Sequence, residues 1–339
     1  MRKVLLVLGV LVVLAVAAAA IYWRHVDAAM HTAGPHAQPL QLLVKPGASV
    51  RGVLAELESL GALADRRAVE LRLRVRGWPK IRTGRYEIPA HATPDDILEQ
   101  LESGRVVLET LTVIEGWTFA DMRRAVEQHP QIRATLRGKD VAEIMAAIGH
   151  AGEHPEGRFF PDTYRFGAGI SDRELYSLSY RKLDETLRAA WESRAAALPI
   201  STAYEALTLA SIVEKETGLA SERPRIAGVF ITRLRRNMRL QTDPTVIYGI
   251  GPSYDGNIRE RDLRTDTPYN TYTRAGLPPT PIALPSREAI EAATRPLETG
   301  EIFFVATGIG DGSHVFSATL EEHNAAVQRY LARLRGNRR

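Results

Sequence analysis

The pattern of apolar positions begins with a long uncharged segment at the N-terminus. Val4 to Trp23 is 20 residues without a charge, which at about 1.5 Å per residue is long enough to cross a hydrocarbon core of about 30 Å. Tyr22 and Trp23 close the segment where interfacial aromatic residues are found. It predicts a transmembrane anchor at 4–23 after a cytoplasmic tip at 1–3. The alternative is a cleaved signal peptide, because Ala15–Ala20 offers small residues to a peptidase.

Two similar strand–helix patterns follow a predicted linker at 24–39. In the first, a strand-like run at 42–44 precedes Ser49, a residue suited to cap a helix. In the second, a run at 86–88 precedes Thr93, which caps a helix with proline at its first position. These patterns predict a small βα domain at 40–110. Such a unit could dock on a glycan or act as a spacer, and both readings remain open.

The remainder of the chain, 111–339, is mainly helical in pattern with short strand signals. A strand is expected at 111–114, and helices dominate 119–198 apart from an aromatic, turn-rich and acidic insert at 156–164. That insert fits a sugar-facing loop or a packed corner. Pro199 separates a helical subdomain, 111–200, from a second part, 201–339, which ends in a strand hairpin and a helix. The whole pattern predicts an α+β fold.

One predicted helix of this second part carries a carboxylate within its apolar stripe. Ser201 or Thr202 can cap this helix, and at about 100° per residue its stripe also includes Glu216. Glu214 points roughly 160° away from Glu216. Because desolvation raises the pKa of a carboxyl group, Glu216 could carry a proton near neutral pH and act as a general acid. The alternative is a solvated glutamate at the end of an amphipathic helix. The apolar members of the stripe are Ala206, Leu209, Ala210 and Val213.

Segments after this helix are rich in groups that bind polar ligands. They supply amides, hydroxyls, a carboxylate and aromatic rings, and a proline-rich run at 276–282 is stiff enough to line a groove. These are the groups that a carbohydrate cleft needs, although the same residues also form ordinary turns. The candidate binding residues are Gln241, Asp243, Tyr248, Tyr269, Asn270 and Tyr272.

Composition and charge exclude several classes of function. The chain has 339 residues and no cysteine, which excludes disulfides, thiolate catalysis and cysteine-ligated metal. Its net charge of +4 comes from dispersed basic residues, so nucleic-acid binding is not predicted. His314 and His323 lack the spacing of a metal site with a third ligand, and no cofactor is expected. What remains is carboxylate chemistry.

Five segments together resemble the endolytic murein transglycosylase, or YceG-like, family. They cover the chain in the family's order from the anchor onward, and they are 160–164, 210–217, 241–249, 269–272 and 276–279. The resemblance implies an inner-membrane protein with one transmembrane helix, a periplasmic LysM-like domain at 40–110 and a lysozyme-like catalytic region with a β insertion. Thr280 stands where the family usually has glycine, which affects only the expected shape of that loop.

The resemblance also implies a chemistry. The family cleaves nascent peptidoglycan strands internally and leaves 1,6-anhydro-muramoyl ends, and its catalytic acid corresponds to Glu216. A glycoside hydrolase needs two carboxylates, whereas a lytic transglycosylase can use one residue as acid and then as base. Glu214 and Asp243 are the rival carboxylates, and a catalytic Asp243 would permit muramidase-type hydrolysis.

The resemblance finally implies partners. These are peptidoglycan glycan strands, the inner membrane and peptidoglycan synthases of the penicillin-binding protein class. An alternative from another functional class is a membrane-tethered, non-catalytic peptidoglycan-binding scaffold.

Overall fold

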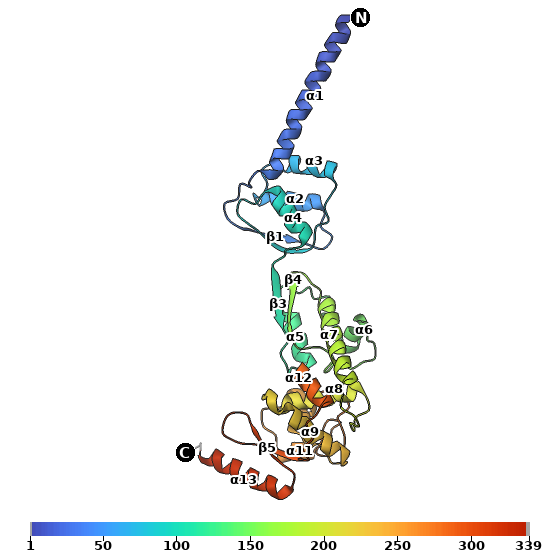
Figure 1. Ribbon diagram of the computed structural model, residues 1–339, viewed down its shortest axis with the longest axis vertical. Helices are drawn as coiled ribbons and strands as arrows, with labels where there is room; N and C mark the ends of the chain where they lie inside the picture. The colour runs from blue at the N-terminus through green and yellow to red at the C-terminus, as the bar shows by residue number, and fades with distance from the viewer. Residues whose placement is uncertain (1, 337–339) are drawn as a thin grey trace. The chain divides into compact units, whose positions relative to one another are not determined.

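The computed structural model describes residues 2–336 and divides the chain into two compact units (Figure 1). The first unit runs as far as Thr110 and also includes Gln131–Arg133 and Arg165–Ile170, and the second contains the rest from Leu111 onward. Residue 1 of the predicted cytoplasmic tip and residues 337–339 of the predicted catalytic region lie outside the described residues. The expected mixture of helices and strands is confirmed.

The N-terminal apolar segment forms one helix, α1 (Arg2–His31). Within the described chain, Lys3–His31 is the one helix long and apolar enough to cross a membrane, which is compatible with a single-pass anchor. The helix continues beyond Trp23 into the segment predicted as a linker. Its final turns are fixed there because Val26 and Met30 are buried in the first unit.

The first unit is built on two antiparallel strands, in which Leu40 lies opposite Ile88 and Val44 opposite Gly84. Alternate residues of both strands are buried, as the period of two residues requires. The predicted caps Ser49 and Thr93 are confirmed, since each side chain accepts a hydrogen bond from a helix backbone N–H. The elements are β1 (Leu40–Val44), α2 (Val50–Ser59), α3 (Arg66–Arg76), β2 (Gly84–Ile88) and α4 (Pro94–Ser103).

A separate two-stranded ribbon joins β3 (Leu108–Thr112) to β4 (Thr163–Gly167). The strand expected at 111–114 therefore begins three residues earlier and ends at Thr112. The insert before β4 is a packed corner, because Phe159 is fully buried and stacks on Phe119 with ring centroids 5.1 Å apart. The helices around it are α5 (Phe119–Gln128), α6 (Val141–Ala147) and α7 (Asp172–Glu192).

The core of the second unit surrounds α8 (Ala203–Glu216), which is capped by Thr202. Eight consecutive residues of α8, from Ala206 to Val213, are buried, so the helix is covered on all sides and not on one stripe. Helices α9 (Arg223–Arg235) and α12 (Arg287–Thr294) pack against it. The remaining elements here are η1 (Ala220–Glu222), α10 (Asp243–Ile250), η2 (Gly251–Ser253) and α11 (Glu260–Arg264).

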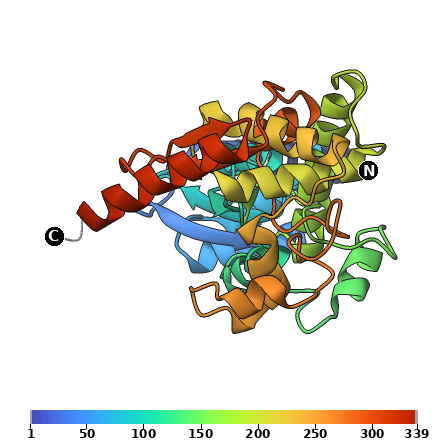
Figure 2. The same cartoon turned by 90° about the horizontal axis from the view of Figure 1, so that it is seen from below.

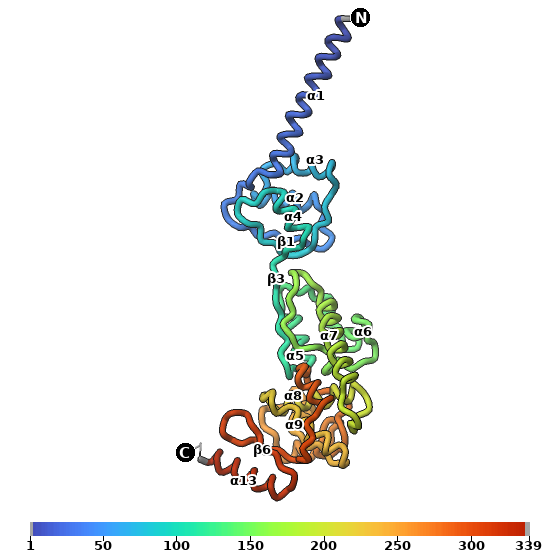
Figure 3. Tube along the Cα trace, in the orientation of Figure 1, coloured from blue at the N-terminus to red at the C-terminus, as the bar shows by residue number. Residues whose placement is uncertain are grey.

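The chain closes with the predicted hairpin and helix. Strands β5 (Phe303–Ala306) and β6 (His314–Ser317) pair antiparallel, with Phe303 opposite Ser317. Glycines at 308, 310 and 312 have positive φ angles, which the turn between the strands requires. Helix α13 (Leu320–Gly336), the long red helix of Figure 2, packs on both strands, and Figure 3 traces the same path.

Candidate active site

Glu216 is the last residue of α8, and its side chain borders a pocket of about 510 Å³. This volume lies within the range of about 300 to 1,000 Å³ that is typical of ligand pockets. The carboxylate is half-buried: protein atoms surround it closely, and the remaining surface faces the pocket. The position at the end of a fully packed helix holds the carboxyl group rigidly at the pocket wall.

The surroundings of Glu216 favour its protonated form. Burial raises the pKa of Glu216 to about 7, and the negative charge of Asp243 acts in the same direction. A hydrogen bond that the Thr242 hydroxyl donates to Oε1 and the charge of Arg233 both oppose this rise in pKa, and they do not cancel it. At neutral pH the group is therefore divided between carboxylic acid and carboxylate.

Glu214 lies in a different environment, although it is only two residues away. Its carboxylate accepts a hydrogen bond from Arg223 Nη2 at 3.0 Å and another from the backbone N–H of Ser286 at 2.9 Å. The Ser286 hydroxyl, which caps α12, also donates to it. Every one of these contacts joins helices of the core. Glu214 is therefore a structural link among α8, α9 and α12.

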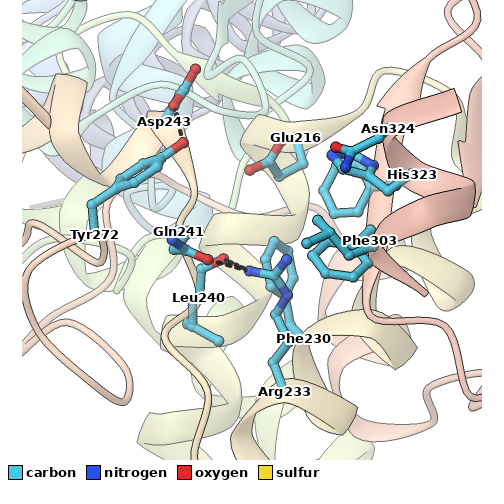
Figure 4. A pocket seen from close by; sticks show the side chains of 12 residues that line it. Glu216, Phe230, Arg233, Leu240, Gln241, Asp243, Tyr272, Phe303, His323 and Asn324 are labelled. Carbon is cyan, nitrogen blue, oxygen red and sulfur yellow. Dashed lines mark hydrogen bonds between the residues drawn. The ribbon is translucent and has the colours of Figure 1, made fainter. Parts of the chain in front are cut away.

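Three of the predicted binding residues line the pocket together with Glu216 (Figure 4). Tyr272 donates a hydrogen bond from its hydroxyl to Asp243 Oδ1 at 2.6 Å. Gln241 has a positive φ of 51°, and its backbone N–H donates to the Thr271 carbonyl at 3.2 Å. These contacts place an amide, a carboxylate and a phenol around the pocket.

The other three predicted binding residues do not line this pocket. Tyr248 donates its hydroxyl to Glu156 at 3.0 Å and packs edge-on against Tyr269, whose own hydroxyl lies 2.9 Å from that of Thr280. Asn270 is fully buried, and its amide oxygen accepts from the Tyr272 backbone N–H at 2.8 Å. Asn270 therefore holds the loop that presents Tyr272, with its amide nitrogen bonded to the carbonyls of Asp262, Leu263 and Thr265.

Sequence reasoning did not find Arg233, whose guanidinium lines the pocket although the residue is only 7% exposed. Its Nε donates to the Ile302 carbonyl at 2.6 Å and its Nη1 to the Leu240 carbonyl at 2.9 Å. It also donates to the Gln241 side chain at 3.3 Å. The spacing of Arg233 in the sequence is the signal that could have found it: Arg233 follows Phe230 by three residues, so both lie on one face of α9.

The second wall of the pocket comes from the C-terminal hairpin and helix, which no local sequence pattern predicts. It consists of Phe303 and Phe304 from β5 with Leu320, His323 and Asn324 from α13. From the sequence, His323 is not a candidate for glycan binding, and its spacing from His314 does not predict a metal site. Among the residues that the structure describes, no cluster of three or more His, Cys, Asp or Glu residues could hold a metal ion.

A second carboxyl group with a raised pKa lies in the packed corner before β4. Glu156 is 4% exposed, and its oxygens accept from the Phe119 backbone N–H at 2.9 Å and the Tyr248 hydroxyl at 3.0 Å. Burial raises the pKa of Glu156 to about 7, and these hydrogen bonds only partly offset the rise. This carboxyl group therefore links the corner to α10.

Glu156→Gln should change how stability depends on pH. A pKa raised from 4.5 to about 7 on folding contributes stability that is complete below pH 4.5 and is lost as pH rises through 7. The wild type should therefore lose roughly 2.5 kcal/mol more than the variant between pH 5 and pH 8. Urea unfolding across this range measures the difference. Glu321→Gln, at an exposed position, is the control, and equal slopes for wild type and Glu156→Gln would rule out a buried, titrating Glu156.

Most of the chain matches one known protein family. A family model described as "YceG-like family" matches residues 42–329. The chain belongs to the YceG-like family.

Relatives of this YceG-like chain carry a functional name. It is 29% identical over 306 residues to the endolytic murein transglycosylase of Bacillus subtilis, covering 85% of this chain and 84% of that protein. It is 26% identical over 323 residues to the endolytic murein transglycosylase of Streptococcus pneumoniae, where the match covers 58% of the longer relative. The crystal structure of a protein described as YceG-like from Listeria monocytogenes has a TM-score of 0.54, with 27% identity over 85% of this chain and 99% of that one.

Proposed function

We propose that this chain is an endolytic lytic transglycosylase of peptidoglycan, with Glu216 as its catalytic acid and base. Membership of the family and the names of the two relatives support the enzyme class. The observation that carries the residue assignment is the half-buried carboxyl group of Glu216, with a pKa of about 7, beside a pocket of about 510 Å³. An acid of this kind can both donate and accept a proton at neutral pH.

In the proposed reaction, protonated Glu216 donates its proton to the oxygen that joins MurNAc C1 to GlcNAc. The bond between C1 and this oxygen breaks, and the muramoyl 6-hydroxyl oxygen forms a new bond to C1. The Glu216 carboxylate removes the proton of that hydroxyl, which returns the group to its starting state. No water is consumed, and the product carries a 1,6-anhydro-MurNAc end. One carboxyl group is sufficient for both proton transfers.

The neighbours of Glu216 receive supporting roles in this proposal. Asp243 raises the pKa of Glu216 and holds the Tyr272 hydroxyl at 2.6 Å. Its negative charge also lies where it can stabilise the positive charge that develops at C1. Gln241 and Tyr272 bind the sugar directly. Tyr248, Tyr269 and Asn270 act through packing and loop position, since they do not line the pocket.

We propose that the first unit is LysM-like and that the second is a lysozyme-like catalytic domain with a β insertion. The change of compact unit at Thr110 and Leu111 supports the boundary between 40–110 and 111–339. The break at Pro199 before α8 supports the further division into 111–200 and 201–339. Similarity to the Listeria structure supports an arrangement shared with that protein.

We also propose a location and a set of partners. The apolar helix α1 supports a single-pass anchor in the inner membrane, with the bulk of the chain periplasmic. The murein transglycosylase names support peptidoglycan strands as the substrate. Association with peptidoglycan synthases follows from the family resemblance alone.

The length of glycan strands during digestion tests this function. An endolytic enzyme cuts within strands, so the mean strand length should fall early while disaccharides stay scarce. An exolytic enzyme would release small products from the start, and a scaffold would leave the length distribution unchanged. Size-exclusion chromatography of strands freed from stem peptides measures the distribution over time.

The activity should fall as pH rises through about 7. Proton donation requires the acid form of Glu216, which is lost above its pKa of about 7. We expect kcat/KM to be halved near pH 7 and to fall about tenfold for each pH unit above that. Initial rates between pH 5 and pH 9 measure this fall of kcat/KM with rising pH. A rate that stays constant to pH 9 would contradict an acid with this pKa.

A further inference from the structure

The wall of the pocket opposite α10 is built from elements that the reaction above does not use. Leu320, His323 and Asn324 of α13 line the same pocket as Glu216. Their spacing of three and four residues places them on one face of the helix. Figure 4 shows His323 and Asn324 on α13 across the pocket from Tyr272 and Asp243, with Glu216 between the two sides.

The imidazole ring of His323 has a fixed orientation. It stacks on Phe303 with ring centroids 4.9 Å apart and an interplanar angle of 19°. The Arg233 guanidinium also lies over the Phe303 ring, 5.2 Å from the ring centroid. Arg233 is itself held by hydrogen bonds to the backbone carbonyls of Ile302 and Leu240. This layered packing presents His323 to the pocket with little freedom to turn.

His323 and Asn324 have hydrogen-bonding capacity that the described part of the protein does not use. The Nδ1 atom of His323 is buried and has no hydrogen-bond partner there, whereas Nε2 is not buried and makes no hydrogen bond to residues 2–336. Nε2 is therefore the ring nitrogen that a sugar group can reach. Burial and the charge of Arg233 lower the pKa of His323, so the ring is neutral near pH 7 and offers one donor and one acceptor. The exposed Asn324 amide makes no hydrogen bond to residues 2–336.

We propose that His323 and Asn324 form a sugar subsite that binds the acetamido and hydroxyl groups of the glycan strand. The neutral amide and imidazole match those uncharged polar groups, and Phe303 and Leu320 supply apolar surface for the C–H face of a sugar ring. A charged ligand is less suitable here, because the Arg233 guanidinium is already engaged by backbone carbonyls. The inference rests on the proposed function: the subsite positions the strand for Glu216 and takes no part in proton transfer.

Variants on one helix test this subsite. Asn324→Ala removes an exposed amide, and His323→Phe keeps an aromatic ring to stack on Phe303 while removing both nitrogens. Each should raise KM for glycan strands about tenfold, as expected for a lost hydrogen bond. The value of kcat and the fall of activity above pH 7 should stay unchanged. Arg329→Ala is the matched control, since Arg329 is exposed and lies nine residues after Leu320, about 180° around the helix.

Binding measured in the Glu216→Gln background separates this inference from the proposed function. Strands freed from stem peptides are titrated into that variant alone and into its combinations with the three changes on α13. Weaker binding only for Asn324→Ala and His323→Phe supports the subsite, even if the wild type proves unable to cleave. If both bind as tightly as Arg329→Ala, the subsite is overturned, whether or not cleavage occurs. Thermal unfolding of each variant confirms that the fold is retained.

Discussion

Glu216→Gln should abolish cleavage of glycan strands while leaving the fold and glycan binding intact. Glutamine has nearly the same shape, and its amide oxygen can still accept the hydrogen bond from the Thr242 hydroxyl. It cannot donate or remove a proton at neutral pH. Because one residue performs both proton transfers in the proposed reaction, the rate should fall by about 10⁴-fold, the upper end of what general acid–base catalysis contributes.

The measurement for Glu216→Gln combines product analysis with binding. Peptidoglycan is incubated with wild type and variant, anhydro-muropeptides are quantified, and binding to isolated strands is measured in parallel. Glu321→Gln makes the same chemical change at an exposed position and should behave as wild type. Persistence of anhydro products in Glu216→Gln would overturn the residue assignment. A wild type that binds strands and never cuts them would favour the scaffold alternative.

Glu214→Ala should damage stability, in contrast to the neighbouring change at Glu216. Removing this carboxylate leaves Arg223, which is only 7% exposed, without its 3.0 Å partner. Losing one partner of a buried ion pair costs about 3 to 5 kcal/mol, and the lower end applies because Glu115 and Glu288 each lie 4.0 Å from the same guanidinium. The variant also loses the contact with Ser286 that supports the start of α12. Thermal unfolding should show a Tm lower by roughly 10 °C.

A double-mutant cycle isolates the ion pair. Each single variant leaves the other member of the pair buried without its partner, whereas the double variant Glu214→Ala, Arg223→Ala removes both charges. The double variant should therefore be more stable than the sum of the two single losses predicts. Additive losses would mean that the two side chains do not interact in solution. A Glu214→Ala protein with the Tm of wild type would contradict the structural role given to Glu214.

The features that sequence predicted well depend on short-range signals. Helical phase is not one of them here: it places Glu216 on an apolar stripe and Glu214 off it, but α8 is covered on all sides, and Glu214 is the carboxylate held among the core helices. The helix caps Thr93 and Thr202 depend only on a few neighbouring residues, and both are present. The prediction of Tyr248 as a binding residue did not use this kind of signal: five residues on α10 place it about 140° from Asp243, and it does not line the pocket.

The features that sequence missed depend on contacts between distant segments. Arg233 reaches the carbonyl of Ile302, and the α13 wall meets Glu216 more than a hundred residues away in the chain. Nothing in the local pattern around His323 indicates such a neighbour. The sequence places Glu156 only within an insert that fits a packed corner or a sugar-facing loop. Its burial follows from packing around Phe159 and Tyr248, which no single segment reveals.

The central claim is that Glu216 cleaves the glycan without water, and the chemistry of the new ends tests it most directly. Wild-type protein is incubated with peptidoglycan in ¹⁸O-labelled water, and the released muropeptides are examined by mass spectrometry. We predict 1,6-anhydro-MurNAc ends, one water lighter than reducing ends and free of ¹⁸O. Reducing ends that carry ¹⁸O would contradict this account and assign hydrolysis, with Asp243 as the second carboxylate.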